Sequence, residues 1–167
     1  MAKIFLILII SFFLALTLNS TEINGVPKII DGDTVHINTK KIRLEGIDAP
    51  EIKQQCKKPF LKVSTIIGFE FNKNYSCGVI AKKKLIDKID SSKIKCISSS
   101  KDRYERFLAT CYMGKINLNK WMVRNGYALA YKKYSKDYVR DEEYAKKNKL
   151  GVWEGPFIMP EKWRKLN

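Results

Sequence analysis

Apolar and polar residues alternate with a period of two in two short stretches near the start of the chain, at residues 35–38 and 42–45. This alternation, with a turn between the two stretches, predicts the strands of a hairpin that has one buried face. Successive side chains on a strand point to opposite faces of the sheet. Arg43 is therefore expected on the face opposite Ile42 and Leu44.

Later in the chain, strand patterns and helix patterns are interleaved. Residues 93–98 and 106–113 are expected to form two more strands. Residues 75–90, 117–125 and 137–150 show the apolar spacing of helices that cover a core. Short strands with interleaved helices predict an α+β fold in which a small barrel is capped by helices.

The first residues have the pattern of a targeting segment. Lys3 is followed by residues 4–16, which are apolar except for one serine. This run is typical of a signal peptide and shorter than the about 20 apolar residues of a membrane span. We expect residues 1–20 to be the signal peptide of a secreted or periplasmic protein. Because the cleavage signal is weak, a signal anchor that holds the protein at the inner membrane through residues 4–18 is the alternative.

The remaining chain has the size and composition of one domain. The protein has 167 residues, 45% of them hydrophobic, and no repeat or low-complexity linker divides the chain. We expect a monomer with its domain at residues 24–155 and a C-terminal tail at 156–167. The net charge is +15, and lysine supplies 26 of the 32 basic residues. Such a positive field attracts nucleic acid, although charge alone is also consistent with a basic surface that has no ligand.

The four cysteines are an even number in a chain that is expected to be exported, so disulfides are expected. Of the three possible pairings we favour the sequential one, Cys56 with Cys77 and Cys96 with Cys111. A structural zinc site lacks ligands because no C-x-x-C pair is present and His36 is the only histidine. The single histidine also argues against catalytic triads and two-histidine ribonuclease chemistry.

Acidic residues gather in one part of this basic chain. Five of the 17 lie between residues 31 and 51, namely Asp31, Asp33, Glu45, Asp48 and Glu51. The sequences D-G-D-T at 31–34 and D-A-P-E at 48–51 stand at expected strand ends, where backbone carbonyls are also free. Calcium and other hard cations bind oxygen ligands of these kinds. Taken singly, each motif is also typical of a simple turn or strand end.

Arginine is scarce, with six residues in the chain. Arg43 and Arg106 both belong to expected strands, on the face opposite the apolar residues. A guanidinium binds two phosphate oxygens at once, although a surface ion pair is the alternative for each arginine. Carboxylates, arginines and a cation together suit phosphoryl transfer, in which positioning and charge stabilisation supply nearly all of the catalysis.

Three stretches resemble, in order and spacing, the active-site motifs of the staphylococcal nuclease family: D-G-D-T at 31–34, R-L-E-G-I-D-A-P-E at 43–51 and D-R-Y-E-R at 102–106. Residues 119–128 and 146–153 resemble the later helices of the family. The paired cysteines and the ending G-P-F-I-M-P-E-K-W-R are similar to its exported bacterial branch. The resemblance implies a five-stranded OB-type barrel with about three helices. It also implies a calcium-dependent endonuclease that cuts DNA and RNA and leaves 3′-phosphate ends.

The resemblance implies a metal site at the first two motifs. Asp33 and Asp48 would bind one calcium ion (Ca2+) together with the main-chain carbonyl of Ala49. Alanine replaces the threonine of the best-known family member here, but a carbonyl ligand does not depend on its side chain.

The resemblance also implies roles for the residues around the metal. Glu51 would position or deprotonate the attacking water, while Arg43 and Arg106 would bind the phosphate and stabilise the charge that builds on it. Tyr104 would contact the nucleotide. Phe107 replaces a glycine of the family and is expected to narrow the site.

Residues 52–74 form a stretch longer than in the best-known family member and border the expected cleft, so substrate access and preference depend on them. We interpret the apolar run Ile66-Ile67-Gly68-Phe69 as core rather than as a binding patch. Two other functions remain as alternatives. One is a nucleic-acid-binding OB-fold module without catalysis, and the other is a membrane-tethered envelope protein.

Overall fold

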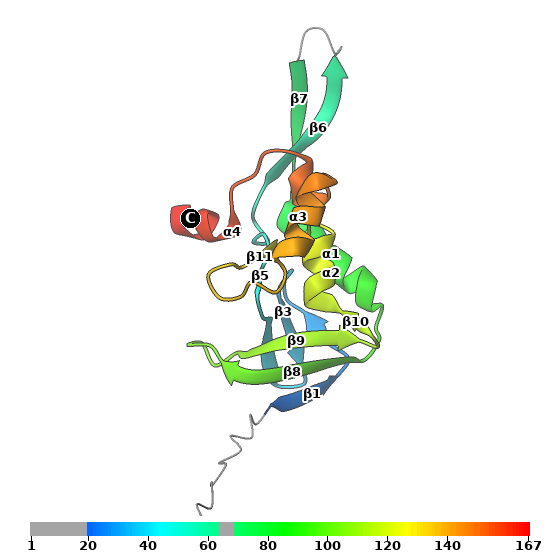
Figure 1. Ribbon diagram of the computed structural model, residues 1–167, viewed down its shortest axis with the longest axis vertical. Helices are drawn as coiled ribbons and strands as arrows, with labels where there is room; N and C mark the ends of the chain where they lie inside the picture. Colours follow the sequence, from blue (N-terminus) through cyan, green and yellow to red (C-terminus); the bar gives the residue numbers. More distant parts are fainter. Residues whose placement is uncertain (1–19, 64–68) are drawn as a thin grey trace, which may run out of the picture.

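The central sheet of the computed structural model, which describes residues 20–63 and 69–167, curls into a barrel (Figure 1). Its strands follow the order β1 (Thr21–Gly25), β8 (Ile94–Lys101), β9 (Phe107–Met113), β4 (Lys40–Leu44), β3 (Thr34–Ile37) and β2 (Lys28–Ile29), and β10 (Ile116–Asn117) pairs with β9. Strands β4 and β9 are parallel, whereas the other neighbours are antiparallel. Two residues, Val26 and Pro27, separate β1 from β2, so one bent strand supplies both ends of the sheet. The expected α+β fold with an OB-type barrel is confirmed.

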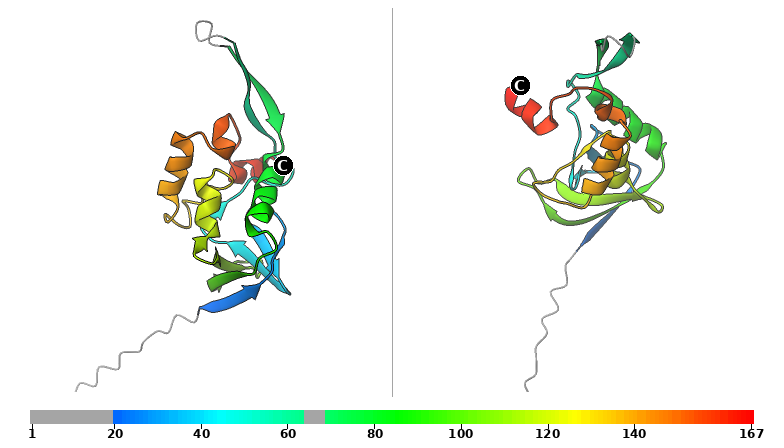
Figure 2. Two further views of the ribbon diagram at one scale, coloured as in Figure 1. Left: turned by 90° about the vertical axis from the view of Figure 1, so that its right-hand side faces the viewer. Right: turned by 45° about the horizontal axis from the view of Figure 1, so that its top comes forward.

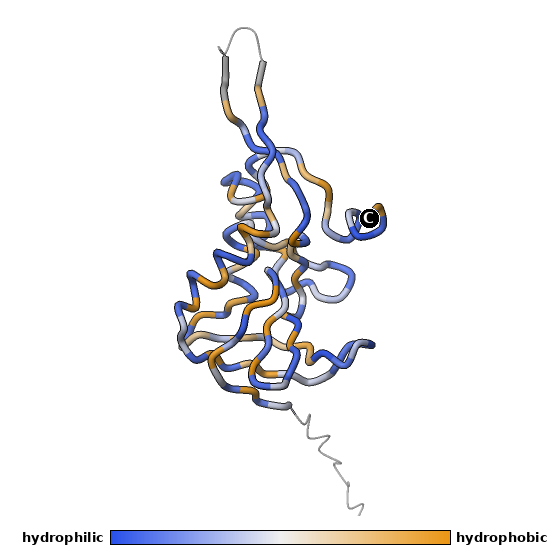
Figure 3. The backbone as a smooth tube through the Cα atoms, turned by 180° about the vertical axis from the view of Figure 1, so that it is seen from behind, coloured by the Kyte–Doolittle hydropathy of each residue, from blue (hydrophilic) through white to orange (hydrophobic). Residues whose placement is uncertain are grey.

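The period-two patterns form the strands that the sequence predicts. In the hairpin of β3 and β4, Val35 lies opposite Ile42, and both are buried together with Ile37 and Leu44. Arg43 points to the other face of β4, as expected. Hydrophobic and hydrophilic residues alternate along the barrel strands in Figure 3. The hairpin therefore supplies part of the core with one face and part of the candidate site with the other.

Helices cover the barrel. In the described part of the chain they are α1 (Cys77–Ile89), α2 (Leu118–Arg124), α3 (Val139–Lys147), the 3-10 helix η1 (Gly151–Glu154) and α4 (Pro160–Leu166). Helix α1 buries Ala81, Leu85 and Ile89, which recur every four residues, as expected for a covering helix. Helices α1, α2 and α3 correspond to the three expected helices. Helix α4 is an additional one and lies inside the segment 156–167, for which the sequence predicted a tail.

A two-stranded arm projects from the body of the molecule (Figures 1 and 2). It consists of β6 (Cys56–Val63) and β7 (Phe69–Tyr75), which pair antiparallel with a bulge at Phe60. The disulfide between Cys56 and Cys77 closes the base of this arm. The arm accounts for most of the long stretch 52–74.

The second disulfide joins Cys96 to Cys111, which lie opposite each other on β8 and β9. Both disulfides have the sequential pairing that the sequence analysis favours. The apolar residues Ile66, Ile67 and Gly68 and the expected signal segment up to residue 19 lie outside the described residues. Within residues 20–63 and 69–167, no helix is long and apolar enough to cross a membrane.

Candidate active site at the strand ends

The turn at residues 31–33 packs directly against the segment that follows β5 (Ile47–Asp48). A side chain at Gly32 would place its Cβ 2.6 Å from the Cβ of Ala49 and 3.0 Å from that of Ala81, so glycine permits this close approach. The backbone N–H of Ala49 donates a hydrogen bond of 2.8 Å to Oδ2 of Asp33. Strand β5 pairs with β11 (Leu129–Ala130), and this pairing holds Asp48 in place. The first and second motifs therefore meet at the ends of their strands.

Arg43 bridges two buried carboxylates. Its Nη1 donates to Oδ1 of Asp33 at 2.6 Å, and its Nη2 donates to Oδ1 of Asp48 at 3.2 Å. Burial would lower the pKa of Arg43, but the charges of Asp33 and Asp48 outweigh it and raise the pKa above its ordinary value. Burial also raises the pKa of Asp48, against the opposing hydrogen bond from Arg164. The site is thus a closely coupled group of opposite charges.

Arg164 of α4 is a third arginine near this site, and the motifs did not identify it. Its Nη1 lies 2.9 Å from Oδ1 of Asp48 and 2.9 Å from Oε1 of Glu51. Burial opposes its positive charge, but the hydrogen bonds to Asp48 and Glu51 outweigh burial and raise the pKa of Arg164. The available signals were the scarcity of arginine and the ending G-P-F-I-M-P-E-K-W-R, whose last residue is Arg164, but no period or spacing connects residue 164 with residue 51.

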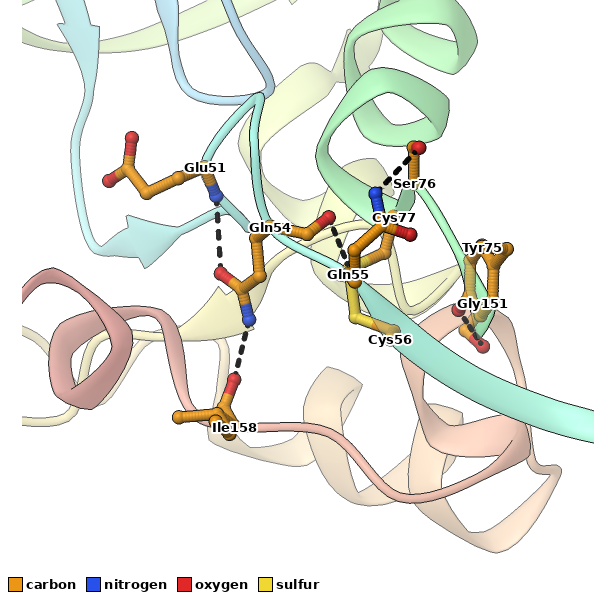
Figure 4. The surroundings of a disulfide bond; sticks show 9 residues. All are labelled: Glu51, Gln54, Gln55, Cys56, Tyr75, Ser76, Cys77, Gly151 and Ile158. Carbon is orange, nitrogen blue, oxygen red and sulfur yellow. Dashed lines mark hydrogen bonds between the residues drawn. A yellow bond between two sulfur atoms is a disulfide. The ribbon is translucent and has the colours of Figure 1, made fainter. Parts of the chain in front are cut away.

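Gln54 links Glu51 to the segment that leads into α4 (Figure 4). The backbone N–H of Glu51 donates to Oε1 of Gln54 at 3.2 Å, and Nε2 of Gln54 donates to the carbonyl of Ile158 at 2.6 Å. Gln54 is fully buried, so these bonds are made away from water. A Cβ at Gly78 would lie 1.8 Å from the carbonyl oxygen of Glu51, so the start of α1 packs on the same backbone. The main chain of Glu51 is thereby held from two sides.

The third motif lies in the loop before β9. Arg106 donates from Nε to Oδ2 of Asp102 at 2.7 Å, and Tyr104 is 61% exposed beside it. In the parallel register of β4 and β9, Arg43 pairs with Leu108, two residues beyond Arg106. Leu108 therefore shares the outer face of Arg43, and Arg106 lies in the loop just before this strand. The structure therefore groups Asp33, Arg43, Asp48, Ala49 and Glu51, whereas Arg106 and Tyr104 lie in the loop before β9, where Arg106 pairs with Asp102.

Asp31 contacts Asp33, one of the two carboxylates that Arg43 bridges. Its Oδ1 accepts a hydrogen bond of 2.9 Å from the backbone N–H of Asp33. Burial and then the nearby charge of Asp33 raise the pKa of Asp31 to about 6. Negative charge is therefore concentrated at this end of the barrel.

The carboxylate oxygens of Asp33 and Asp48 are donors of the kind that hard cations bind. Both carboxylates are buried, and each faces an arginine that balances its charge. In the part of the chain that the structure describes, no group of three His, Cys, Asp or Glu side chains could hold a metal ion by itself. A cation bound to the two carboxylates would complete its coordination with carbonyl, water or phosphate oxygens.

The fold and the site together define an OB-type barrel protein with a carboxylate and arginine site suited to phosphate chemistry. A family model described as staphylococcal nuclease homologue matches residues 41–155. The chain therefore belongs to the staphylococcal nuclease family, as its motifs predicted, and is a hydrolytic nuclease that acts on phosphodiester bonds of nucleic acid. The family consists generally of metal-dependent nucleases.

Known proteins are similar over most of the chain. An uncharacterized endonuclease of Haemophilus influenzae is 35% identical over 98% of this chain and 85% of its own length. A micrococcal nuclease of Shigella flexneri is 29% identical over 85% of this chain and 80% of its own length. The succinoglycan biosynthesis protein ExoI of Rhizobium meliloti is 31% identical over 77% of this chain and 63% of its own length.

Proposed function

We propose that this nuclease is a calcium-dependent endonuclease that hydrolyses both DNA and RNA and leaves 3′-phosphate ends. The observation that carries the proposal is the bridge from Arg43 to Asp33 and Asp48 beside Glu51. Two buried carboxylates, one further carboxylate and guanidinium groups are the parts that phosphodiester hydrolysis requires.

Asp33 and Asp48 hold the calcium ion in this proposal, together with the main-chain carbonyl of Ala49. Calcium, when bound, supplies positive charge that stabilises the negative charge growing on the phosphate. The backbone N–H of Ala49 orients the Asp33 carboxylate through its hydrogen bond. Arg43 keeps both carboxylates in position from the other side.

Glu51 accepts the proton of the attacking water, and the water oxygen bonds to phosphorus as the bond from phosphorus to the 5′-oxygen breaks. This displacement yields a 3′-phosphate end and, once the departing 5′-oxygen takes a proton from solvent, a 5′-hydroxyl end. Arg43 and Arg106 bind the non-bridging phosphate oxygens. To do so, Arg43 must turn from Asp33 and Asp48, and Arg106 must turn from Asp102. Tyr104 is exposed beside Arg106 and contacts the nucleotide.

We also propose that the protein acts outside the cytoplasm as a monomer. The two disulfides support an oxidising compartment such as the periplasm or the medium. Residues 1–20 serve as the export signal, with anchoring at the inner membrane by residues 4–18 as the alternative form.

The decisive experiment measures cleavage of single-stranded DNA, duplex DNA and RNA by the purified protein with calcium, with magnesium and with a chelator. Cleavage that needs calcium and yields ends that a 3′-phosphatase can process supports the proposal. Cleavage with magnesium alone would overturn the choice of ion. Binding without any turnover would identify a nucleic-acid-binding module instead.

A further inference from the structure

One face of the arm formed by β6 and β7 carries aromatic rings and lysines in alternation. Lys58 pairs across the strands with Lys73, and Cys56 pairs with Tyr75. Cross-strand partners share a face, and so do alternate residues along one strand. Phe71 therefore lies on the same face as Lys73 and Tyr75.

The contacts of the lysines place Phe60 on this face as well. Nζ of Lys73 lies 5.2 Å from the ring centroid of Phe60, and Nζ of Lys58 lies 5.3 Å from that of Tyr75. Phe60 is 67% exposed and Phe71 is 56% exposed, so both rings are open to solvent. We call the set of Tyr75, Lys58, Lys73, Phe60 and Phe71 the aromatic-lysine face.

The opposite face of the arm has a different chemistry. Lys57 pairs there with Asn74, and Pro59 pairs with Asn72. Lys57, Asn72 and Asn74 are exposed, and no aromatic residue belongs to these two pairs. The rings are therefore confined to one face of this part of the arm, although both faces carry lysine.

The aromatic-lysine face leads into a cavity of about 370 Å³ at the base of the arm. Tyr75 and Lys58 line this cavity together with Lys84, Tyr127 and Lys149. Glu154 is the one carboxylate among the lining residues. The combination of rings and ammonium groups thus continues from the arm onto α1 and onto the loops that follow α2 and α3.

We infer that the aromatic-lysine face binds a single strand of nucleic acid outside the cleavage site. Unpaired bases stack on exposed rings, and lysines between the rings bind the phosphates that link those bases. A duplex keeps its bases stacked on each other and does not offer them to such rings. An anionic membrane is the competing partner, but its apolar interior favours rings gathered without ammonium groups between them.

The inference rests on the proposed function, since the bound strand is the substrate of the same enzyme. Four residues, 52–55, connect Glu51 to the first residue of the arm. The disulfide from Cys56 to Cys77 and the bond from the N–H of Lys57 to the carbonyl of Pro156 hold the base of the arm. A long strand that is bound to the arm has a raised effective concentration at the cleavage site. A dinucleotide is too short to contact the arm and the cleavage site at the same time.

The test measures binding without cleavage, in a chelator, by fluorescence anisotropy with a labelled oligothymidylate. Replacing both rings, Phe60→Ser with Phe71→Ser, should raise the Kd for an oligomer of about 20 nucleotides about ten-fold. Lys73→Ser should raise this Kd, whereas Lys57→Ser, which removes the same charge from the opposite face, should change it less than about two-fold. Equal effects of the two lysine variants, or an unchanged Kd in the ring variant, would overturn the inference. Weaker binding to phosphatidylglycerol vesicles with unchanged oligonucleotide binding would assign the face to membranes instead.

Kinetics separate this inference from the nuclease proposal. With calcium, the ring variant should show a raised KM for the long oligomer and an unchanged kcat, with no change on a chromogenic dinucleotide substrate. An equal loss of kcat/KM on the long oligomer and on the dinucleotide would show that the rings act on the cleavage site. A wild-type protein that binds but does not cleave would refute the proposed reaction while leaving the binding result intact. Thermal melting of each variant confirms that the body remains folded.

Discussion

The guanidinium Nη1 of Arg164 lies 2.9 Å from Oε1 of Glu51, although 113 residues separate the two along the chain. The same nitrogen is 2.9 Å from Oδ1 of Asp48. The last helix of the protein therefore places positive charge directly on the carboxylates that we propose for metal binding and for water activation. Gln54 fixes this arrangement by joining the backbone of Glu51 to that of Ile158.

Arg164→Ala should strengthen calcium binding. The substitution removes a positive charge that lies next to Asp48 and repels a bound cation, so we expect the Kd for calcium to fall about five-fold. Isothermal titration calorimetry on the metal-free protein measures this change. Lys165→Ala is the matched control, since Lys165 lies on the same helix and pairs only with the half-buried Glu161 among the ion pairs described. A Kd that stays constant or rises would show that Arg164 does not oppose the cation.

Arg43→Ala should destabilise the metal-free protein. It leaves Asp33 and Asp48 buried without their shared partner, and breaking a buried ion pair on one side costs about 3–5 kcal/mol. Urea unfolding in a chelator measures the loss, and added calcium should restore part of it by neutralising the same carboxylates. Arg140→Ala, at an exposed position, provides the comparison. An Arg43 variant as stable as the wild type would contradict the role of the bridge.

Glu51→Gln should reduce turnover and leave folding nearly unchanged. The amide keeps the shape of the side chain but does not accept the proton of the attacking water, so kcat should fall by about 100-fold or more. Stability should change by no more than about 0.5 kcal/mol because the side chain is 34% exposed. Glu161→Gln on α4 is the control for a loss of charge near the site. A Glu51 variant with a nearly normal rate would refute our assignment of the general base.

Asp102 should contribute stability that depends on pH. Burial opposes its charge, but the hydrogen bonds from Arg106 outweigh burial and hold the pKa of Asp102 below its ordinary value of 3.8. A carboxyl with a lowered folded-state pKa stabilises the protein above its unfolded-state pKa and loses this effect as the pH falls through the folded-state value. Asp102→Asn should therefore lower Tm by about 2–4 °C at pH 6 and by progressively less as the pH falls below 3.8. Calorimetry across this pH range measures the difference in Tm between the variant and the wild type, with Asp87→Asn as an exposed control. A Tm difference that stays constant at all pH values would contradict the role of the Asp102 carboxylate.

The sequence by itself determined the fold class, the strands of the barrel and the three expected helices. Val35, Ile37, Ile42 and Leu44 follow a period of two, and such local patterns depend only on which side chains avoid water. The same alternation placed Arg43 on the outer face. Cysteine number and spacing were enough to favour the disulfide pairing that the structure contains.

Only the tertiary structure decided the surroundings of those residues. Arg164 reaches Glu51, and Gln54 reaches the carbonyl of Ile158, because the chain after η1 returns along the base of the arm, where the N–H of Lys57 bonds to the carbonyl of Pro156. The strands of the arm pair with each other and not over the core, and no pattern along either strand reveals which partner it pairs with. Contacts between distant segments arise from how complete elements pack, and a pattern of neighbouring residues contains no information about that packing.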